Sequence, residues 1–283
     1  MSDDHPGCRG TDNGKEEALN LDRIKAGLIS SLFGVNIVYV SALGSTNDLA
    51  KDLALGGAPE GTVVLTEEQT AGKGRRGRSW LAPSKTNLLF SILLRPALSL
   101  NRVFSLTMAL ALAALEAVEG ETGVPCRIKW PNDLYAGARK LGGILTEFAG
   151  KEKQVDWVVL GLGLNVNWCP EQGKETPWPA ATSILSETRE RFPRDGLLVQ
   201  ILRRFESHLV RLLSGAGEDL YRKWNQCSMV LGKEVVIESE GSRMTGKATR
   251  IDENGALILE DGEGRRHVIT HGDVSLRWFS RPS

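Results

Sequence analysis

The stretch Ala71–Trp80, AGKGRRGRSW, contains four cations, three glycines and a tryptophan in ten positions. Strand-like segments precede it at Thr62–Thr66 and follow it at Asn87–Leu94, which indicates a loop held between strands. Glycines lack Cβ atoms and let backbone N–H groups approach a ligand, and the surrounding cations attract negative charge. The stretch therefore predicts a local anion site in a sheet-based domain.

The common phosphate-binding motifs do not describe this loop. The chain has no GxxxxGK[ST] motif, and arginines and a tryptophan stand where a dinucleotide-binding helix needs apolar residues. An RNA-binding tail would repeat the Arg-Gly pattern, which occurs here once. We expect one compact anion, such as a carboxylate joined to a phosphate, with Trp80 stacking on a base. A solvated surface loop is the alternative.

The charge of the whole chain supports a local site. Lys and Arg total 35 and Asp and Glu total 35, so no net field draws the 283-residue protein to polyanions or anionic membranes. A nucleic-acid-binding module that uses the loop and Trp80 remains an alternative of a different class. We expect neither a nucleic-acid nor a membrane partner.

Cysteine usage and the N-terminus predict a cytoplasmic protein. The N-terminal segment has no apolar signal region, and no stretch reaches the roughly 18 apolar residues of a membrane span. The cysteines lie far apart without a CxxC pair, so we expect four reduced thiols rather than a disulfide framework or a zinc site. They are Cys8, Cys126, Cys169 and Cys227.

Strands and helices alternate in a pattern typical of an α+β fold. Helices are predicted at Thr46–Leu55, capped by the Ser45 and Thr46 hydroxyls, at Phe104–Val118 and at Leu197–Leu213. After Met229 about five short strands, separated by Gly-containing turns, predict a small β-barrel. The predicted organisation is a disordered tail at 1–15, a large α+β domain at 16–228 and a barrel domain at 229–283.

Three further motifs carry polar groups that a ligand could use. Lys129–Asp133, KWPND, ends in a turn and leads to a strand that begins with Lys140, whose burial needs a counter-ion unless its side chain snorkels to water. Gly44–Asn47 offers hydroxyls and an amide at a helix start, although such residues also serve as plain caps. Gly161–Asn167, GLGLNVN, ends a buried strand in two amides.

Together these motifs closely resemble those of biotin protein ligases, in order and in spacing. The resemblance runs from about Val35 to the C-terminus and rests on STN at 45–47, QTAGKGRRGRSW at 69–80, KWPND at 129–133, RKLGGIL at 139–145 and GLGLNVN at 161–167. It implies a catalytic domain like that of class II aminoacyl-tRNA synthetases, followed by an SH3-like barrel. It also implies ATP and Mg²⁺ as cofactors, biotinyl-5′-AMP as the intermediate, and transfer of biotin to one lysine of a biotin carboxyl carrier domain.

The resemblance also assigns roles to individual residues. Arg75, Lys140 and Asp133 are the catalytic candidates, and Asp133 is our hypothetical aid to deprotonation of the acceptor lysine. The predicted biotin-binding residues are Ser45, Thr46, Asn47, Gln69, Gly72, Lys73, Gly74, Arg75 and Lys140. The predicted ATP-binding residues are Arg75, Arg78, Trp80, Lys129, Asn132, Lys140 and Asn165. Lys73 stands where many relatives have arginine and lacks the planar fork of that side chain.

A lipoate protein ligase is the nearest alternative, because it too adenylates a carboxylic acid and modifies a carrier lysine. Many bacterial biotin ligases also carry an N-terminal winged helix that binds DNA, and the residues before Ile37 do not match one. We therefore expect a ligase without a DNA-binding domain. The Mg²⁺ ligands and the oligomeric state stay open, with a homodimer among the options.

Overall fold

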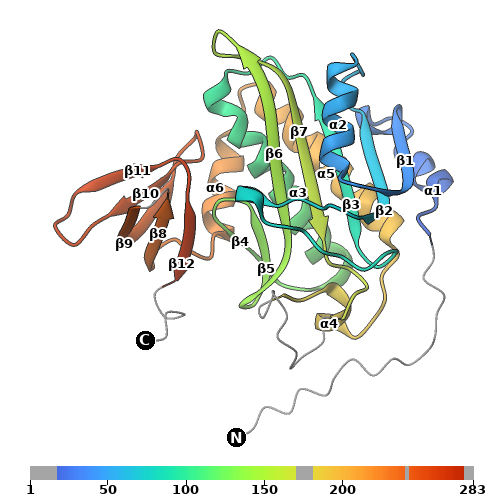
Figure 1. Cartoon of the computed structure of the whole chain (residues 1–283). Helices are drawn as coiled ribbons and strands as arrows, with labels where there is room; N and C mark the ends of the chain where they lie inside the picture. The colour runs from blue at the N-terminus through green and yellow to red at the C-terminus, as the bar shows by residue number, and fades with distance from the viewer. Residues whose placement is uncertain (1–17, 170–180, 240–241, 277–283) are drawn as a thin grey trace, which may run out of the picture.

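The computed structural model describes residues 18–169, 181–239 and 242–276, and the predicted tail at 1–15 lies outside them. A mixed sheet of seven strands forms the larger part, in the order β1-β2-β3-β7-β6-β5-β4 (Figure 1). Among the described strands of this sheet β1 and β2 pair in parallel, and the other neighbours are antiparallel. The strands are β1 (Ile37–Leu43), β2 (Val63–Gln69), β3 (Leu88–Leu94), β4 (Cys126–Lys129), β5 (Asp133–Ala136), β6 (Arg139–Lys151) and β7 (Gln154–Leu164).

Helices cover both faces of the sheet: α3 and α5 lie on one face and the shorter α2 on the other (Figure 1). Strand side chains alternate between the two layers. In β2, Val63 and Leu65 join the core that contains α3 and α5, whereas Val64 packs with α2. The described helices are α1 (Leu21–Gly27), α2 (Thr46–Leu55), α3 (Val103–Thr122), α4 (Ile184–Thr188), α5 (Arg194–Leu213) and α6 (Glu218–Cys227).

Helix α3, which contains the helix predicted at Phe104–Val118, is apolar nearly all round. By length and composition alone, Leu100–Thr122 could cross a membrane, and 78% of its most apolar window is buried inside the protein. That burial is typical of the central helix of a folded core.

The α2 layer stops short of one end of the sheet, and glycines mark the uncovered part. Val159 packs under α2, and Gly161 and Gly163 follow it on the same face of β7 at two-residue intervals. Gly143 on β6 lies directly opposite Gly163, and Ser91 on β3 lies beside Gly161. Because these glycines carry no side chain, the sheet itself forms the floor of a hollow.

The start of the described chain packs against β2 and α5. Helix α1 is a short helix that lies against α5. Leu19 N donates to Glu67 Oε1 at 2.6 Å, and Arg194 Nη1 lies 2.6 Å from Glu67 Oε2. This ion pair is buried, and it joins the N-terminal segment to β2 and α5.

Helix α6 leads into a second sheet of five strands, in the order β11-β10-β9-β8-β12. This second sheet packs on the larger domain: Trp130 Nε1 donates to Gly255 O at 2.9 Å, and Asn225 Oδ1 accepts from Ile251 N at 2.9 Å. The barrel is therefore fixed beside β4 and β5. Its strands are β8 (Glu234–Ser239), β9 (Ser242–Ile251), β10 (Leu257–Glu260), β11 (Arg266–Ile269) and β12 (Asp273–Leu276).

Two local expectations are wrong, and a third holds in part. Ser45 is the N-cap of α2, but its hydroxyl makes no capping hydrogen bond, and Thr46 Oγ1 bonds elsewhere. The chain turns at 130–132 between β4 and β5, so Asn132 lies in a turn as expected, whereas Asp133 is the first residue of β5 and pairs with Lys129. Cys169 is disulfide-bonded, so the expectation of four reduced thiols fails there. Among the described residues Cys126 and Cys227 are free.

Candidate active site

Hydrogen bonds within the cationic loop close it into a compact turn. Trp80 N donates to Gly72 O at 2.9 Å, and Gly74 N donates to Arg78 O at 2.7 Å. A Cβ on Gly72 would lie 2.3 Å from Trp80 O, so the close approach of the two chain segments requires glycine there. The loop, which the sequence marked as an anion site, thus has a defined backbone beside the glycine floor.

Polar side chains at the start of α2 form one end of the pocket. Gln69 Oε1 accepts from Thr46 N at 2.8 Å and from Thr46 Oγ1 at 3.1 Å. Ser91 Oγ donates to Asn47 Oδ1 at 2.6 Å, and Asn47 Nδ2 donates to Glu147 Oε2 at 2.9 Å. These bonds hold hydroxyl and amide groups in fixed directions, which suits the N–H and C=O groups of a small polar ring.

A lysine and a carboxylate meet above the glycine floor. Lys140 Nζ lies 2.7 Å from Asp133 Oδ1, and both side chains are mostly buried. Gly143 makes room for them, because a Cβ there would lie 3.1 Å from Asp133 Oδ1 and 3.3 Å from Lys140 Nζ. The counter-ion that a half-buried lysine needs is therefore Asp133, at the start of the neighbouring strand.

Indole and ammonium also lie close together in this part of the pocket. Lys140 Nζ is 5.6 Å from the centroid of the Trp80 ring, within the range of a cation–π contact. The Trp80 ring lies on the floor, since a Cβ on Gly163 would be 2.5 Å from Trp80 Cε2. Trp80 Nε1 is buried and has no hydrogen-bond partner in the described structure, which leaves one donor for a ligand.

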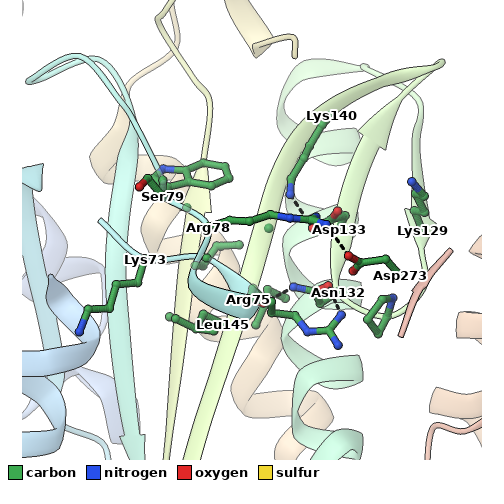
Figure 2. A pocket seen from close by; sticks show the side chains of 18 of the residues that line it. Lys73, Arg75, Arg78, Ser79, Lys129, Asn132, Asp133, Lys140, Leu145 and Asp273 are labelled. Carbon is green, nitrogen blue, oxygen red and sulfur yellow. Dashed lines mark hydrogen bonds and ion pairs between the residues drawn. The ribbon is translucent and has the colours of Figure 1, made fainter. Parts of the chain in front are cut away.

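Further cations of the pocket are partly desolvated. Arg75 Nη1 donates to Asn132 Oδ1 at 3.2 Å, and Figure 2 shows this pair below the Lys140–Asp133 pair. Burial lowers the pKa of Arg75, and nearby Asp273 and Asp133 oppose that shift. Burial likewise lowers the pKa of Lys129, against the opposing attraction of Asp133. Depressed pKa values on buried cations mean that an arriving anion would be bound favourably.

The wall behind Lys129 contains Tyr135. The Lys129 ammonium lies 5.5 Å from the centroid of the Tyr135 ring. Burial, with a further contribution from the charge of Asp133, raises the pKa of Tyr135 to about 12. The phenol therefore stays protonated at neutral pH and adds no negative charge beside the lysines.

The barrel supplies another wall, which sequence reasoning missed. Asp273 and Glu238 line the pocket together with Val274 and Ser275. Arg78 Nη2 bonds to Asp273 Oδ2, as the dashed line in Figure 2 shows. No local motif marks these barrel residues, so only the packing of the two domains reveals them.

Apart from Gly72 and Asn165, every residue predicted for the site lines this pocket. Gly72 shapes the loop from behind Trp80. Asn165 is 3% exposed, and its amide donates to Thr182 O at 2.9 Å and accepts from Asn87 Nδ2 at 3.3 Å. The structure thus gives Asn165 partners within the protein instead of a place in the pocket wall.

Lys73 lines the pocket near its backbone, but its ammonium is engaged elsewhere. Lys73 Nζ lies 2.6 Å from Asp48 Oδ2 on α2, and in Figure 2 the side chain points away from Lys140 and Asp133. Burial acts to raise the pKa of Asp48, but hydrogen bonds from Lys73 and Lys51 outweigh it and hold this pKa below its ordinary value. Lys73 therefore ties the loop to α2.

Comparisons with known proteins agree with these features. Residues 39–165 match the Biotin/lipoate A/B protein ligase family, and residues 230–277 match the Biotin protein ligase C terminal domain. A Biotin--[acetyl-CoA-carboxylase] ligase from Mycobacterium tuberculosis is 35% identical over 241 residues, which cover 83% of this chain and 86% of the relative. A Bifunctional ligase/repressor BirA from Bacillus subtilis is 32% identical over 262 residues, 93% of this chain and 80% of the relative.

Solved structures give the same relationship. The biotin protein ligase from Aquifex aeolicus in complex with biotin and ATP superposes with a TM-score of 0.72 at 29% identity, over 86% of this chain and 99% of that one. Fold, pocket and sequence similarity coincide over both domains, and the chain therefore belongs to the biotin protein ligase family.

Proposed function

We propose that this pocket carries out both steps of biotin attachment. The enzyme activates biotin with ATP to biotinyl-5′-AMP and then transfers the biotinyl group to a lysine. Relatives named as ligases for acetyl-CoA-carboxylase support a biotin carboxyl carrier domain as the acceptor. The observation that carries the proposal is the convergence of Arg75, Lys129 and Lys140 on one pocket that also has a polar end at Thr46 and Gln69.

In the first step a biotin carboxylate oxygen forms a bond to the α-phosphorus of ATP, and the bond to pyrophosphate breaks. This attack needs no protein nucleophile; it needs two anions held together while charge develops on the phosphate. Arg75 and Lys140 supply that charge stabilisation, and the hydroxyl and amide groups near Gln69 hold the ureido ring.

Mg²⁺ accompanies ATP in this proposal and, when bound, would neutralise negative charge on the phosphates. Within the described ranges no group of three or more His, Cys, Asp or Glu side chains could hold a metal ion. An ion here would therefore be carried mainly by phosphate oxygens, as is common for Mg²⁺ in nucleotide sites.

In the second step the neutral amine of the acceptor lysine attacks the acyl carbon, and AMP departs with the electron pair of the cleaved bond. The amine must lose a proton. Asp133 is our candidate to accept it, because its carboxylate lies in the pocket next to Lys140.

Mass spectrometry of a biotin carboxyl carrier domain tests the proposal directly. The carrier is incubated with the enzyme, ATP, Mg²⁺ and either biotin or lipoate. We expect a mass increase of one biotin that requires ATP and is lost in Lys140→Ala but retained in Lys151→Ala, a matched change at the exposed end of the same strand. Transfer of lipoate to its own carrier, without biotin transfer, would move the assignment to the lipoate ligases. Transfer of neither would reopen nucleic-acid binding by the loop.

A further inference from the structure

The loop at 72–80 is held from two sides by side chains that do not point into the pocket. On the α2 side Lys73 pairs with Asp48 at 2.6 Å. On the barrel side Arg76 Nη1 donates to Glu238 O at 3.2 Å and lies 3.6 Å from Asp273 Oδ2. Arg75, between these two anchors, faces Asn132 inside the pocket.

Arg76 has a backbone conformation that needs external support. Its φ of 55° and ψ of 38° fall in the left-handed region, which is unfavourable for a residue with a Cβ. Such conformations persist where surrounding contacts hold them. The contacts available to the Arg76 side chain are with the barrel, so the barrel stabilises the turn that places Arg75.

One barrel carboxylate serves two loop arginines. Asp273 Oδ2 bonds to Arg78 Nη2 and lies near Arg76 Nη1. Asp273 is the first residue of β12, which pairs with β8 and so lies next to Glu238. A single exposed ion pair contributes little, but a carboxylate shared by two guanidinium groups from one turn restrains the turn as a unit.

We propose that Arg76 and Asp273 are positioning residues of the ligase, through which the C-terminal barrel clamps the cationic loop over the activated biotin. This inference rests on the proposed function. Arg76 does not line the pocket, so its role is to hold the loop rather than to contact the substrate. When the clamp is lost, the loop opens more often, biotinyl-5′-AMP escapes, and biotin binds less tightly.

An alternative role for Asp273, as a temporary partner of Arg78 that ATP displaces, makes a different prediction. If its carboxylate merely occupied Arg78 until the phosphates of ATP displaced it, removing its charge would strengthen ATP binding. Under the clamp, removing the charge loosens the loop and weakens the retention of biotin and of the adenylate.

The test compares Asp273→Asn, Arg76→Ala and Arg76→Gly with the unchanged enzyme. Asp219→Asn serves as the matched control, because Asp219 also pairs with an exposed arginine, Arg222, on the surface of α6. Adenylate formation is followed by pyrophosphate release, and adenylate escape by the dissociation of labelled biotinyl-5′-AMP. Glycine adopts the left-handed backbone conformation without strain, so Arg76→Gly removes the side-chain contact with the barrel but adds no backbone strain. Its comparison with Arg76→Ala therefore separates the two effects.

For all three variants we expect adenylate escape to rise by about tenfold, the size of a lost charge-assisted hydrogen bond. The KM for biotin should rise in all three variants. In the two Arg76 variants, kcat for transfer to the carrier at saturating biotin should change by less than about twofold, because Arg76 does not line the pocket. Trypsin should cleave the loop of Asp273→Asn faster, although its cleavage sites are unchanged.

Escape at the unchanged rate in Asp273→Asn and Arg76→Ala, or tighter ATP binding by Asp273→Asn, would overturn the clamp. Escape that rises equally in Asp219→Asn would do so too, since it would show a general loss of stability. Failure of the unchanged enzyme to form any adenylate is a separate result, because it would reject the proposed function itself.

Discussion

The indole of Trp80 lies directly on the backbone of Gly163, where a Cβ would be 2.5 Å from Trp80 Cε2 and 2.8 Å from Nε1. This contact sets the depth of the pocket. Gly143, which is paired with Gly163 across the two strands, makes room for the Lys140–Asp133 pair in the same way. Two glycines on neighbouring strands thus let the aromatic and the charged groups of the site share one small area of sheet.

Gly163→Ala should impair biotin binding without unfolding the protein. Its methyl group would push the indole off the floor, and overpacking of this kind typically costs about 1–3 kcal/mol, or on the order of 10- to 100-fold in affinity. Calorimetric titration with biotin measures the change. Gly262→Ala is the control, because a Cβ there meets nothing within 4 Å. Equal affinities for the two variants would show that the indole does not shape the pocket.

The glycine floor illustrates what the sequence can and cannot predict. GLGLNVN and RKLGGIL were recognised as site motifs, and the strands that carry them were predicted. The amide of Asn165 was assigned to the nucleotide, yet its partners are Asn87 and Thr182, which are distant in the sequence. Periodicity gives the face on which a residue lies; it does not tell which distant segment meets that residue.

The contribution of the barrel to the site was beyond sequence reasoning for a similar reason. The five strands were predicted from their turns, but Asp273 carries no motif. It reaches the loop because contacts such as that between Trp130 Nε1 and Gly255 O fix the barrel beside β4 and β5. Domain packing depends on many weak contacts spread along the chain, and it therefore leaves no local signal.

Arg75→Gly should slow adenylation and release the intermediate. Arg75 is a desolvated cation that faces the pocket beside Asn132, and one lost electrostatic donor of this kind is worth about 3 kcal/mol, on the order of 100-fold in rate. We expect biotin on bystander lysines, detected by streptavidin blotting of a mixture of carrier and unrelated protein. Strict specificity for the carrier in this variant would contradict the containment role of Arg75.

Asp133→Asn should slow the transfer of biotin to the acceptor lysine more than it slows the formation of biotinyl-5′-AMP. The variant keeps the shape of the side chain but cannot accept a proton from the acceptor amine. Single-turnover transfer from purified biotinyl-5′-AMP should therefore slow by at least about tenfold near pH 7, and raising the pH should restore part of it by deprotonating the amine. A transfer rate equal to that of the unchanged enzyme would rule out Asp133 as the proton acceptor.

Acid should selectively remove a contact on the helical face of the protein. Burial acts to raise the pKa of Glu116, but hydrogen bonds from His208 and Lys223 outweigh it and lower this pKa to about 2. A depressed pKa stabilises the fold above the pKa of the unfolded chain, near 4.3, and the benefit is lost as the pH falls toward 2. The Glu116 side chain is 28% exposed, so we expect its depressed pKa to contribute at most about 3 kcal/mol to the free energy of unfolding.

Denaturant unfolding as a function of pH tests this contact. The difference in free energy of unfolding between the unchanged protein and Glu116→Gln should be largest near pH 6 and should shrink between about pH 5 and pH 2. Glu152→Gln, an exposed glutamate in the turn between β6 and β7, should show little difference at any pH. A gap that does not change with pH would show that packing, and not charge, makes Glu116 important.

The buried pair of Arg194 and Glu67 gives the strongest stability prediction. The side chains are 4% and 2% exposed, and Glu67 Oε1 also accepts from Leu19 N. Arg194→Met leaves the carboxylate buried without its counter-ion and should lower the free energy of unfolding by about 3–5 kcal/mol. Adding Glu67→Gln to this variant should recover part of the loss, because an uncharged amide is less costly to bury than a lone carboxylate.

Urea unfolding of the single and double variants measures both effects, with Arg191→Met as an exposed control on the approach to α5. A similar loss in Arg191→Met would show that the arginine stem matters more than the ion pair. Glu67 precedes Gln69 by two residues on β2, so the same variants also test whether this anchor holds the polar end of the pocket. If it does, the KM for biotin rises in Arg194→Met and falls back in the double variant, while Arg191→Met leaves it unchanged.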